Sequence, residues 1–323
     1  MDEAAATTAK DDHGDQIDAG FLQDVLAGLG AMPKTMAPKY FYDAAGAALF
    51  GDICELPEYY VTRTEIGILR ANGAAMAEAI GTAAMLIEFG AGSLDKIRIL
   101  LDVLKAPAGV AAVDISEHQL LRAADDLRRT YPGLPVTSIA ADFTRAVDIP
   151  EPAGAAARKV AFFPGSTIGN FDPDAATAFL RGVTQTVGVG GGLLIGYDLK
   201  KDTQVLLDAY DDAAGVTAAF NLNLLVRINR ELGGNFDTAT FRHVARYDDR
   251  LGRIEMHLQS TLAQTVTIAG RTFGFAAGET IHTENSYKYA VQDFDALAAA
   301  AGMQRQALWS DADEYFAVAL YGC

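Results

Sequence analysis

Residues Ala83 to Asp114 read AAMLIEFGAGSLDKIRILLDVLKAPAGVAAVD, which is a buried strand, a glycine turn, a helix and a second buried strand. An apolar run that ends in Gly-x-Gly and opens an amphipathic helix is typical of the start of a nucleotide-binding βαβ unit. Gly90 and Gly92 let the backbone approach a ligand closely, because neither residue has a Cβ atom. Asp114, at the tip of the second strand, is placed to accept hydrogen bonds from two ribose hydroxyls.

The charges around this turn narrow the choice of ligand. The dinucleotide fingerprint Gly-x-Gly-x-x-Gly requires a third glycine where this chain has Asp95. Glu88 and Asp95 also place negative charge where a pyrophosphate would meet the helix N-terminus. A cationic ligand with a ribose and no phosphate, such as S-adenosylmethionine (SAM), fits better. The turn by itself is equally compatible with any doubly wound α/β fold.

Composition places the chain among soluble globular proteins, since 50% of its 323 residues are apolar and 21% are charged. The formal net charge of -16 argues against nucleic-acid and anionic-membrane partners. Two cysteines, Cys54 and Cys323, make no disulfide framework and indicate a reducing, cytoplasmic location. The histidines show no metal-ligand spacing, so we expect no metal.

Strands and helices alternate from the glycine turn to Asp198, which predicts a parallel sheet. A helix is expected before the turn, from Thr64 to Ala79, with Thr62 and Glu65 forming a capping box at its start. After Asp198 the pattern changes to helices and antiparallel strands, which indicates an inserted element. The chain closes with a helix, a strand and a hairpin into a last strand. SAM-dependent methyltransferases of the Rossmann-like class close their sheets in this way.

Further segments carry a family resemblance. They are PKYFYD (38–43), LPEYYVTRTE (56–65), GSTIGN (165–170), AYDD (209–212), RIEM (253–256) and TENSYK (283–288). In this order they resemble the histidine-specific Nα-methyltransferases of ergothioneine biosynthesis, and the match runs from about Phe21 to the C-terminus. The resemblance implies transfer of three methyl groups from SAM to the α-amine of L-histidine, which gives the betaine hercynine.

The resemblance also implies an organisation for the whole chain. We expect a Rossmann-like class I SAM-dependent methyltransferase core, formed by residues 64–198 and 289–323. An inserted α+β substrate-binding domain would comprise residues 17–63 and 199–288, after a mobile tail at 1–16. The expected assembly is a monomer that binds L-histidine as its small-molecule partner.

The donor site implied by the resemblance surrounds the glycine turn. Its expected members are Tyr42, Glu88, Gly90, Gly92, Lys96, Asp114, Asp142 and Phe143. Asp142 and Phe143 follow a strand end where the adenine would lie; without the resemblance, a strand-terminating acid and a core aromatic residue would be the simpler interpretation. Leu94 departs from the pattern, because many methyltransferases have a third glycine at this position.

The substrate site implied by the resemblance draws on every part of the chain. Its expected members are Tyr42, Tyr59, Gly165, Asn170, Tyr210, Met256, Glu284 and Ser286. Tyr42 is the expected catalytic residue, near the amine, while Asn170 and Tyr210 would contact the amino-acid head of the substrate.

Glu284 and Ser286 would receive the two imidazole nitrogens, with Met256 and Tyr59 against the ring. In a regular strand Glu284 and Ser286 share one face with His282 and Lys288, and from the residues alone this face fits a solvated edge strand. Two alternatives stay open at this point: a methyltransferase for another amine such as tryptophan, and a SAM-binding sensor without turnover.

Overall fold

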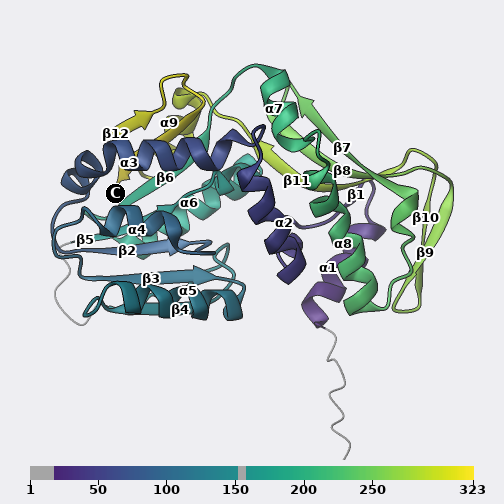
Figure 1. Ribbon diagram of the computed structural model, residues 1–323, viewed down its shortest axis with the longest axis horizontal. Helices are drawn as coiled ribbons and strands as arrows, with labels where there is room; N and C mark the ends of the chain where they lie inside the picture. Colours follow the sequence, from purple (N-terminus) through teal and green to yellow (C-terminus); the bar gives the residue numbers. More distant parts are fainter. Residues whose placement is uncertain (1–17, 152–157) are drawn as a thin grey trace, which may run out of the picture.

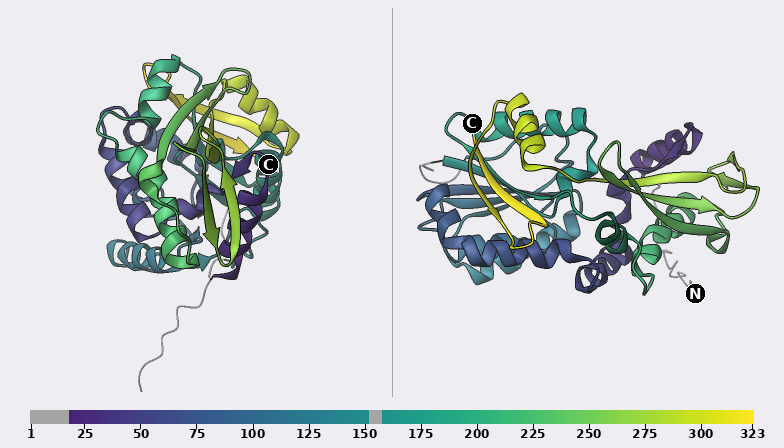
Figure 2. Two further views of the ribbon diagram at one scale, coloured as in Figure 1. Left: turned by 90° about the vertical axis from the view of Figure 1, so that its right-hand side faces the viewer. Right: turned by 90° about the horizontal axis from the view of Figure 1, so that it is seen from above.

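A computed structural model describes residues 18–151 and 158–323, so the expected tail at 1–16 lies outside the described residues. Figures 1 and 2 show an elongated molecule with a large sheet in one half and a smaller sheet in the other. Among the helices that the structure describes, none combines the length and apolar composition needed to cross a membrane.

The large sheet has seven strands in the order β12-β13-β6-β5-β2-β3-β4. Their bounds are β2 (Ala84–Phe89), β3 (Gly109–Asp114), β4 (Val136–Ala140), β5 (Arg158–Phe163), β6 (Gly192–Asp198), β12 (Gln304–Ser310) and β13 (Phe316–Gly322). Strands β2 to β6 pair in parallel, whereas β13 is antiparallel to both β6 and β12. The predicted parallel sheet and its closing hairpin are therefore confirmed.

Helices cover both faces of this sheet (Figure 1). One buried cluster contains side chains from α3 (Tyr60–Ile80), α4 (Asp95–Leu101) and α5 (Glu117–Thr130). The opposite cluster contains α6 (Pro173–Val187) and α9 (Val291–Ala300), where the Phe294 ring stacks on Tyr197 at 4.2 Å between centroids. The inner strands are thus buried on both faces, which explains why β2, β3, β6 and β13 are largely apolar, whereas the outer strands β4 and β12 carry polar residues.

The smaller sheet has the order β1-β11-β8-β7. It comprises β1 (Lys34–Thr35), β7 (Phe241–Asp248), β8 (Arg253–Ser260) and β11 (Thr280–Tyr287), with β9 (Gln264–Ile268) and β10 (Arg271–Phe275) as a separate hairpin. The surrounding helices are α1 (Ala19–Gly30), η1 (Pro38–Phe41), α2 (Ala44–Glu55), α7 (Thr203–Tyr210), α8 (Val216–Leu232) and η3 (Thr238–Thr240). Strands β1, β7 and β10 were not predicted: β1 has only two residues, β7 carries charged residues on its exposed face, and β10 contains Arg271 and Gly274.

The predicted start of α3 is wrong. The helix begins at Tyr60, and its N-cap residue Tyr59 makes no side-chain capping bond. Glu65 does not complete a capping box, because it lies inside the helix and its side chain is fully buried against the large sheet. A Cβ on Gly196 in β6 would lie 1.9 Å from Glu65 Oε1, so this glycine makes room for the carboxylate.

A β-bulge changes the faces of β11. Its register against β8 shifts between His282, which pairs with His257, and Glu284, which pairs with Met256. Because His257 and Met256 point to opposite faces of β8, His282 and Glu284 do so as well. The prediction that His282 shares a face with Glu284 is therefore wrong, since the extra residue inverts the alternation.

The short helix η2 (Thr167–Asn170) joins the two sheets. It packs so closely on β11 that a Cβ on Gly169 would lie 2.9 Å from the carbonyl oxygen of Tyr287 and 3.1 Å from its amide nitrogen. Backbone atoms cannot yield as a flexible side chain does, so only glycine fits here without displacement.

We expect Gly169→Ala to lower the free energy of unfolding by about 1–3 kcal/mol, because the added methyl group overpacks the contact with β11. Gly67→Ala is the matched control, since no atom lies within 4 Å of a Cβ at this exposed position on α3. It should leave stability unchanged or raise it by up to about 1 kcal/mol. Urea denaturation measures the free energy of unfolding of both variants, and equal changes in the two would contradict the close contact between Gly169 and β11.

Candidate active site

The glycine turn holds a buried acid at the end of β2. Glu88 is 2% exposed, and its Oε2 has no hydrogen-bond partner within the described residues. Burial raises the pKa of Glu88 well above its usual value, against the opposing charge of Lys96. A buried carboxylate oxygen without a hydrogen-bond partner destabilises the folded protein, and a cationic ligand can supply the missing donor. The site therefore fits the ammonium group of SAM.

The turn after Glu88 contains three residues with positive φ angles. Gly90, Gly92 and Leu94 have φ angles of 70°, 45° and 58°. Leu94 adopts the left-handed conformation in which a glycine would be unstrained, and its side chain is 1% exposed in the core. Leu94 in place of a glycine therefore keeps the backbone conformation of the turn and adds an apolar side chain to the core.

The predicted acids and aromatic ring of the donor site lie at neighbouring strand ends. Asp114, at the end of β3, accepts a hydrogen bond on Oδ2 from Gly92 N at 3.1 Å, which ties it to the turn. Asp142, beyond β4, accepts a hydrogen bond from Thr144 N at 3.0 Å. The Phe143 ring stands 3.6 Å from the position of a Cβ on the first glycine of the turn. The structure therefore brings these three residues to one edge of the sheet.

Lys96 lies beside this group but is already paired. Its Nζ is 2.6 Å from Glu65 Oε2, and both carboxylate oxygens of Glu65 accept from Gly165 N, at 3.0 and 2.9 Å. Glu65 thus links the loop after β5 to the helix that follows the glycine turn. The sequence does not reveal this role of Glu65, because its neighbour Gly196 lies far along the chain and the Thr-x-x-Glu pattern indicates a helix cap instead.

A cluster of aromatic side chains, which we take as the wall of a candidate substrate pocket, lies between the two sheets. Tyr42 follows η1, Tyr59 precedes α3 and Tyr210 ends α7, so separate segments bring the three rings together. The ring centroids of Tyr59 and Tyr210 are 6.1 Å apart, and Phe50 contacts both Tyr42 and Tyr59 at 5.5 and 6.3 Å. Burial raises the pKa of Tyr42 well above its usual value, and the nearby Glu284 raises it further. These hydroxyls therefore stay protonated.

Glu284 faces this pocket from β11, directly opposite Met256 on β8. Burial raises the pKa of Glu284 to about 7, against the opposing charge of Lys288. Met256 is 2% exposed and belongs to the apolar cluster that lines this side of the sheet. The site thus pairs an acid that can gain or lose a proton near neutral pH with an apolar wall.

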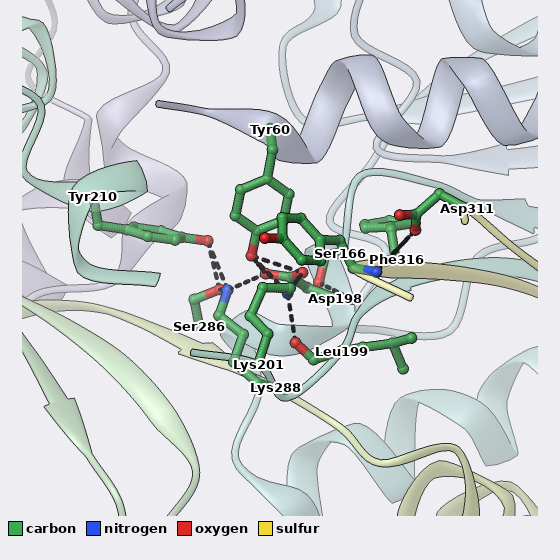
Figure 3. A network of polar contacts seen from close by, with 11 residues as sticks. Tyr60, Ser166, Asp198, Leu199, Lys201, Tyr210, Ser286, Lys288, Asp311 and Phe316 are labelled. Carbon is green, nitrogen blue, oxygen red and sulfur yellow. Dashed lines mark hydrogen bonds and ion pairs between the residues drawn. The ribbon is translucent and has the colours of Figure 1, made fainter. Parts of the chain in front are cut away.

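Ser286 and Tyr210 form the polar end of the pocket (Figure 3). Their hydroxyl oxygens are 2.7 Å apart, and Lys288 Nζ donates to Ser286 Oγ at 2.8 Å and to Tyr210 Oη at 3.1 Å. The same ammonium is 2.7 Å from Asp198 Oδ2, at the end of β6. The expectation that Lys288 shares the face of Ser286 is confirmed, whereas its links to Tyr210 and Asp198 were not predicted.

Gly165 and Asn170 bracket the loop that separates the donor turn from the pocket. Gly165 has a φ of 82° and is held by Glu65, while Asn170 is the last residue of η2, a helix that packs on β11. The structure therefore places Gly165 beside the Glu65–Lys96 pair and Asn170 on the short helix that contacts the strand of Glu284 and Ser286. Their roles in binding stay predictions.

Glu255, His257 and His282 lie on the other face of the small sheet, with possible ligand atoms within 4.8 Å of one another. Glu255 Oε1 already pairs with Arg253, and Nδ1 of the buried His257 has no partner within the described residues. His257 Nε2 lies 3.0 Å from Glu255 Oε2, and the rings of His257 and His282 stack with their centroids 4.7 Å apart, so the three side chains contact one another.

A family described as "Histidine-specific methyltransferase, SAM-dependent" matches residues 21–323. The chain is 41% identical over 304 residues to "Histidine N-alpha-methyltransferase" of Mycolicibacterium smegmatis, covering 92% of this chain and 93% of that protein. The protein of that name from Mycobacterium tuberculosis is 40% identical over 312 residues, covering 94% and 96%.

Two more distant similarities concern a longer protein and a solved structure. "Ergothioneine biosynthesis protein 1" of Neurospora crassa is 30% identical, over 88% of this chain but 32% of that longer protein. Among solved structures, the "DhpI-SAM-HEP complex" is 14% identical with a TM-score of 0.47, covering 95% of this chain and 100% of that chain. The strand order and donor turn define a Rossmann-like class I SAM-dependent methyltransferase. The chain belongs to the histidine-specific family of these enzymes.

We expect Glu65→Gln to weaken SAM binding about 10-fold, because the variant loses the ion pair with Lys96 and turns an amide donor toward Gly165 N. Glu78→Gln is the matched control, since Glu78 is exposed on the same helix. Isothermal titration with S-adenosylhomocysteine measures both. Unchanged affinity of Glu65→Gln would show that the buried carboxylate does not shape the donor site.

Proposed function

We propose that the protein transfers three methyl groups in succession from SAM to the α-amine of L-histidine, giving hercynine and S-adenosylhomocysteine. The observation that carries this proposal is the pairing of Glu284 with Met256 beside Ser286, in a pocket closed by tyrosines. An imidazole ring has two nitrogens and an apolar edge, which this arrangement matches. The 41% identity to a protein named Histidine N-alpha-methyltransferase supports the same substrate.

The donor residues bind and orient the methyl source. SAM supplies an electrophilic methyl group on its sulfonium; each transfer breaks one S–C bond, forms one N–C bond and yields a neutral thioether. The methylammonium formed in the first and in the second transfer loses one proton to solvent before the next transfer. Glu88 would hold the ammonium of the donor, Asp114 its ribose hydroxyls, and Asp142 with Phe143 its adenine. Gly90, Gly92 and Lys96 would shape the turn around it. Their common role is to fix the methyl group in line with the amine, which is the main source of rate enhancement expected for this displacement.

Tyr42 would act at the amine. A free α-amine has a pKa of about 7.7–8.0, so a useful fraction is neutral near pH 7. Because burial and Glu284 raise the pKa of Tyr42, its hydroxyl stays protonated and would hold the amine by hydrogen bonding instead of taking a proton from it. Asn170, Gly165 and Tyr210 would hold the amino-acid head from the other side.

Glu284 and Ser286 would recognise the ring. An ionised Glu284 accepts a hydrogen bond from one ring N–H, and Ser286 donates to the other nitrogen. Tyr59 and Met256 would pack on the ring faces. An indole has one N–H and no ring acceptor, so it would leave Ser286 unpaired in a buried site.

We further propose the organisation expected from the sequence. Residues 64–198 and 289–323 would form the methyltransferase core, and residues 17–63 and 199–288 the substrate-binding domain. The bridge between Leu199 and Tyr289 lies where these parts would join. We infer a cytoplasmic monomer without a metal or a nucleic-acid partner, in keeping with the net charge of -16 and two free cysteines.

Incubation of the protein with SAM and an equimolar mixture of the common amino acids should yield histidine heavier by three methyl groups, detected by mass spectrometry. The same incubation without SAM is the control. Methylation of another amino acid would keep the donor site and discard the ring recognition by Glu284, Ser286 and Met256. Donor binding without any product would indicate a sensor.

We expect Glu284→Gln to lower the activity toward histidine and to raise the stability of the folded protein above neutral pH. Folded Glu284 has a pKa of about 7, above its ordinary value of 4.5, so the folded state binds more protons between these values and stability falls as pH rises through this window. The variant lacks this loss. Its melting temperature relative to wild type should therefore be higher at pH 8 than at pH 5, while its kcat/KM for histidine falls at least about 10-fold. A melting difference that is independent of pH would contradict the shifted pKa.

A further inference from the structure

Lys288 follows β11 and is 2% exposed. A lysine ammonium has three donor protons, and Lys288 has three acceptors: Asp198 Oδ2 at 2.7 Å, Ser286 Oγ at 2.8 Å and Tyr210 Oη at 3.1 Å. Figure 3 shows these contacts converging on the ammonium. All its donors are therefore engaged, and its position is set from three directions.

These contacts limit what the two hydroxyls can offer to a ligand. Ser286 and Tyr210 have two hydroxyl protons between them, and one is used in the 2.7 Å bond that joins them. Lys288 donates to both oxygens, so each already accepts a hydrogen bond. One hydroxyl proton is left over, and it needs an acceptor outside the cluster. The pair thus presents a donor to the pocket.

Asp198 anchors this cluster to the large sheet. Its side chain is fully buried, and the charges of Lys288 and Lys201 hold its pKa below the usual range despite burial. Its Oδ2 also accepts from Tyr60 Oη at 2.7 Å. Tyr60, Lys201 and Lys288 stand at the three places where the chain passes between the two sheets. The position of Lys288 is thereby tied to the frame that also holds the donor turn.

We propose that Lys288 is a positioning residue for the substrate pocket: anchored on Asp198, it fixes Ser286 and Tyr210 so that they present a hydroxyl proton to an acceptor atom of the substrate. This inference rests on the proposed function. It specifies that the substrate atom at this end of the pocket is an unprotonated ring nitrogen or a carboxylate oxygen. A cationic or purely donating group there would leave the hydroxyl proton without a partner.

Lys201 provides a matched control. It is also buried and also pairs with Asp198, at 2.6 Å from Oδ1, but its other contacts are Tyr60 Oη and Leu199 O, away from Ser286 and Tyr210. Removing either lysine takes one positive charge from the same carboxylate. Only the removal of Lys288 frees the two pocket hydroxyls.

The test compares Lys288→Met with Lys201→Met. Lys288→Met should raise KM for histidine about 10- to 100-fold, the loss expected for a charged hydrogen bond, and leave the affinity for S-adenosylhomocysteine within about 3-fold of wild type. Lys201→Met should lower the melting temperature but leave KM for histidine within about 3-fold. Equal effects on KM, or a parallel loss of donor affinity in Lys288→Met, would overturn the proposal.

A double-mutant cycle with Ser286→Ala supplies a second measurement. If Lys288 acts through Ser286, its removal should cost much less in the Ser286→Ala background, whereas additive losses would overturn the coupling. Lys288→Gln replaces Lys288→Met in the cycle if the latter does not fold. Wild-type turnover of histidine tests the proposed function separately: if another amine is the substrate, the same comparison run with that amine still decides the role of Lys288.

Discussion

The arrangement of the two sheets depends on the ion pairs that the buried carboxylate of Asp198 forms. It lies at the end of β6 and binds Lys201 and Lys288, both within 2.7 Å. A buried charge is tolerated only when it is paired and hydrogen-bonded, so the two ammonium groups and the Tyr60 hydroxyl are held in place by the cost of leaving Asp198 without them. These contacts join Tyr60, Lys201 and Lys288, which lie on the three segments that connect the two sheets, and they fix the relative position of the residues between the sheets.

Glu65 is the corresponding buried and paired carboxylate beside the glycine turn. Its carboxylate spans Lys96 and the Gly165 amide, and the absence of a side chain at Gly196 makes room for it. Ser166, next in the chain, has its Oγ 3.0 Å from Asp198 N. A continuous set of polar contacts therefore runs from the helix after the glycine turn to the end of β6 and on to Ser286. Donor and substrate residues share one framework, as a displacement between two bound molecules requires.

Two other carboxyls have the opposite character. Glu88 and Glu284 form no ion pair within the described residues, and burial raises the pKa of both against the opposing charges of Lys96 and Lys288. Uncompensated acids destabilise the folded chain, but they become favourable when a cationic or N–H-bearing ligand arrives. The acids thus differ in their surroundings: Asp198 and Glu65 are paired with lysines of the protein itself, whereas Glu88 and Glu284 are the acids that the proposed function assigns to ligands.

The alternating strands and helices, the glycine turn with its acids and the closing hairpin were all predictable from the sequence, because each depends on neighbours along the chain and on hydrophobic periodicity. The strand faces around Glu284 were only partly predictable, since the bulge that separates it from His282 arises from pairing with β8. Glu65 was misassigned for the same reason: its partners at Lys96, Gly165 and Gly196 are distant in sequence. Local patterns determine which elements form, but buried charge pairs are made between elements, so only the tertiary structure decided which acids bind the protein itself and which face the pocket.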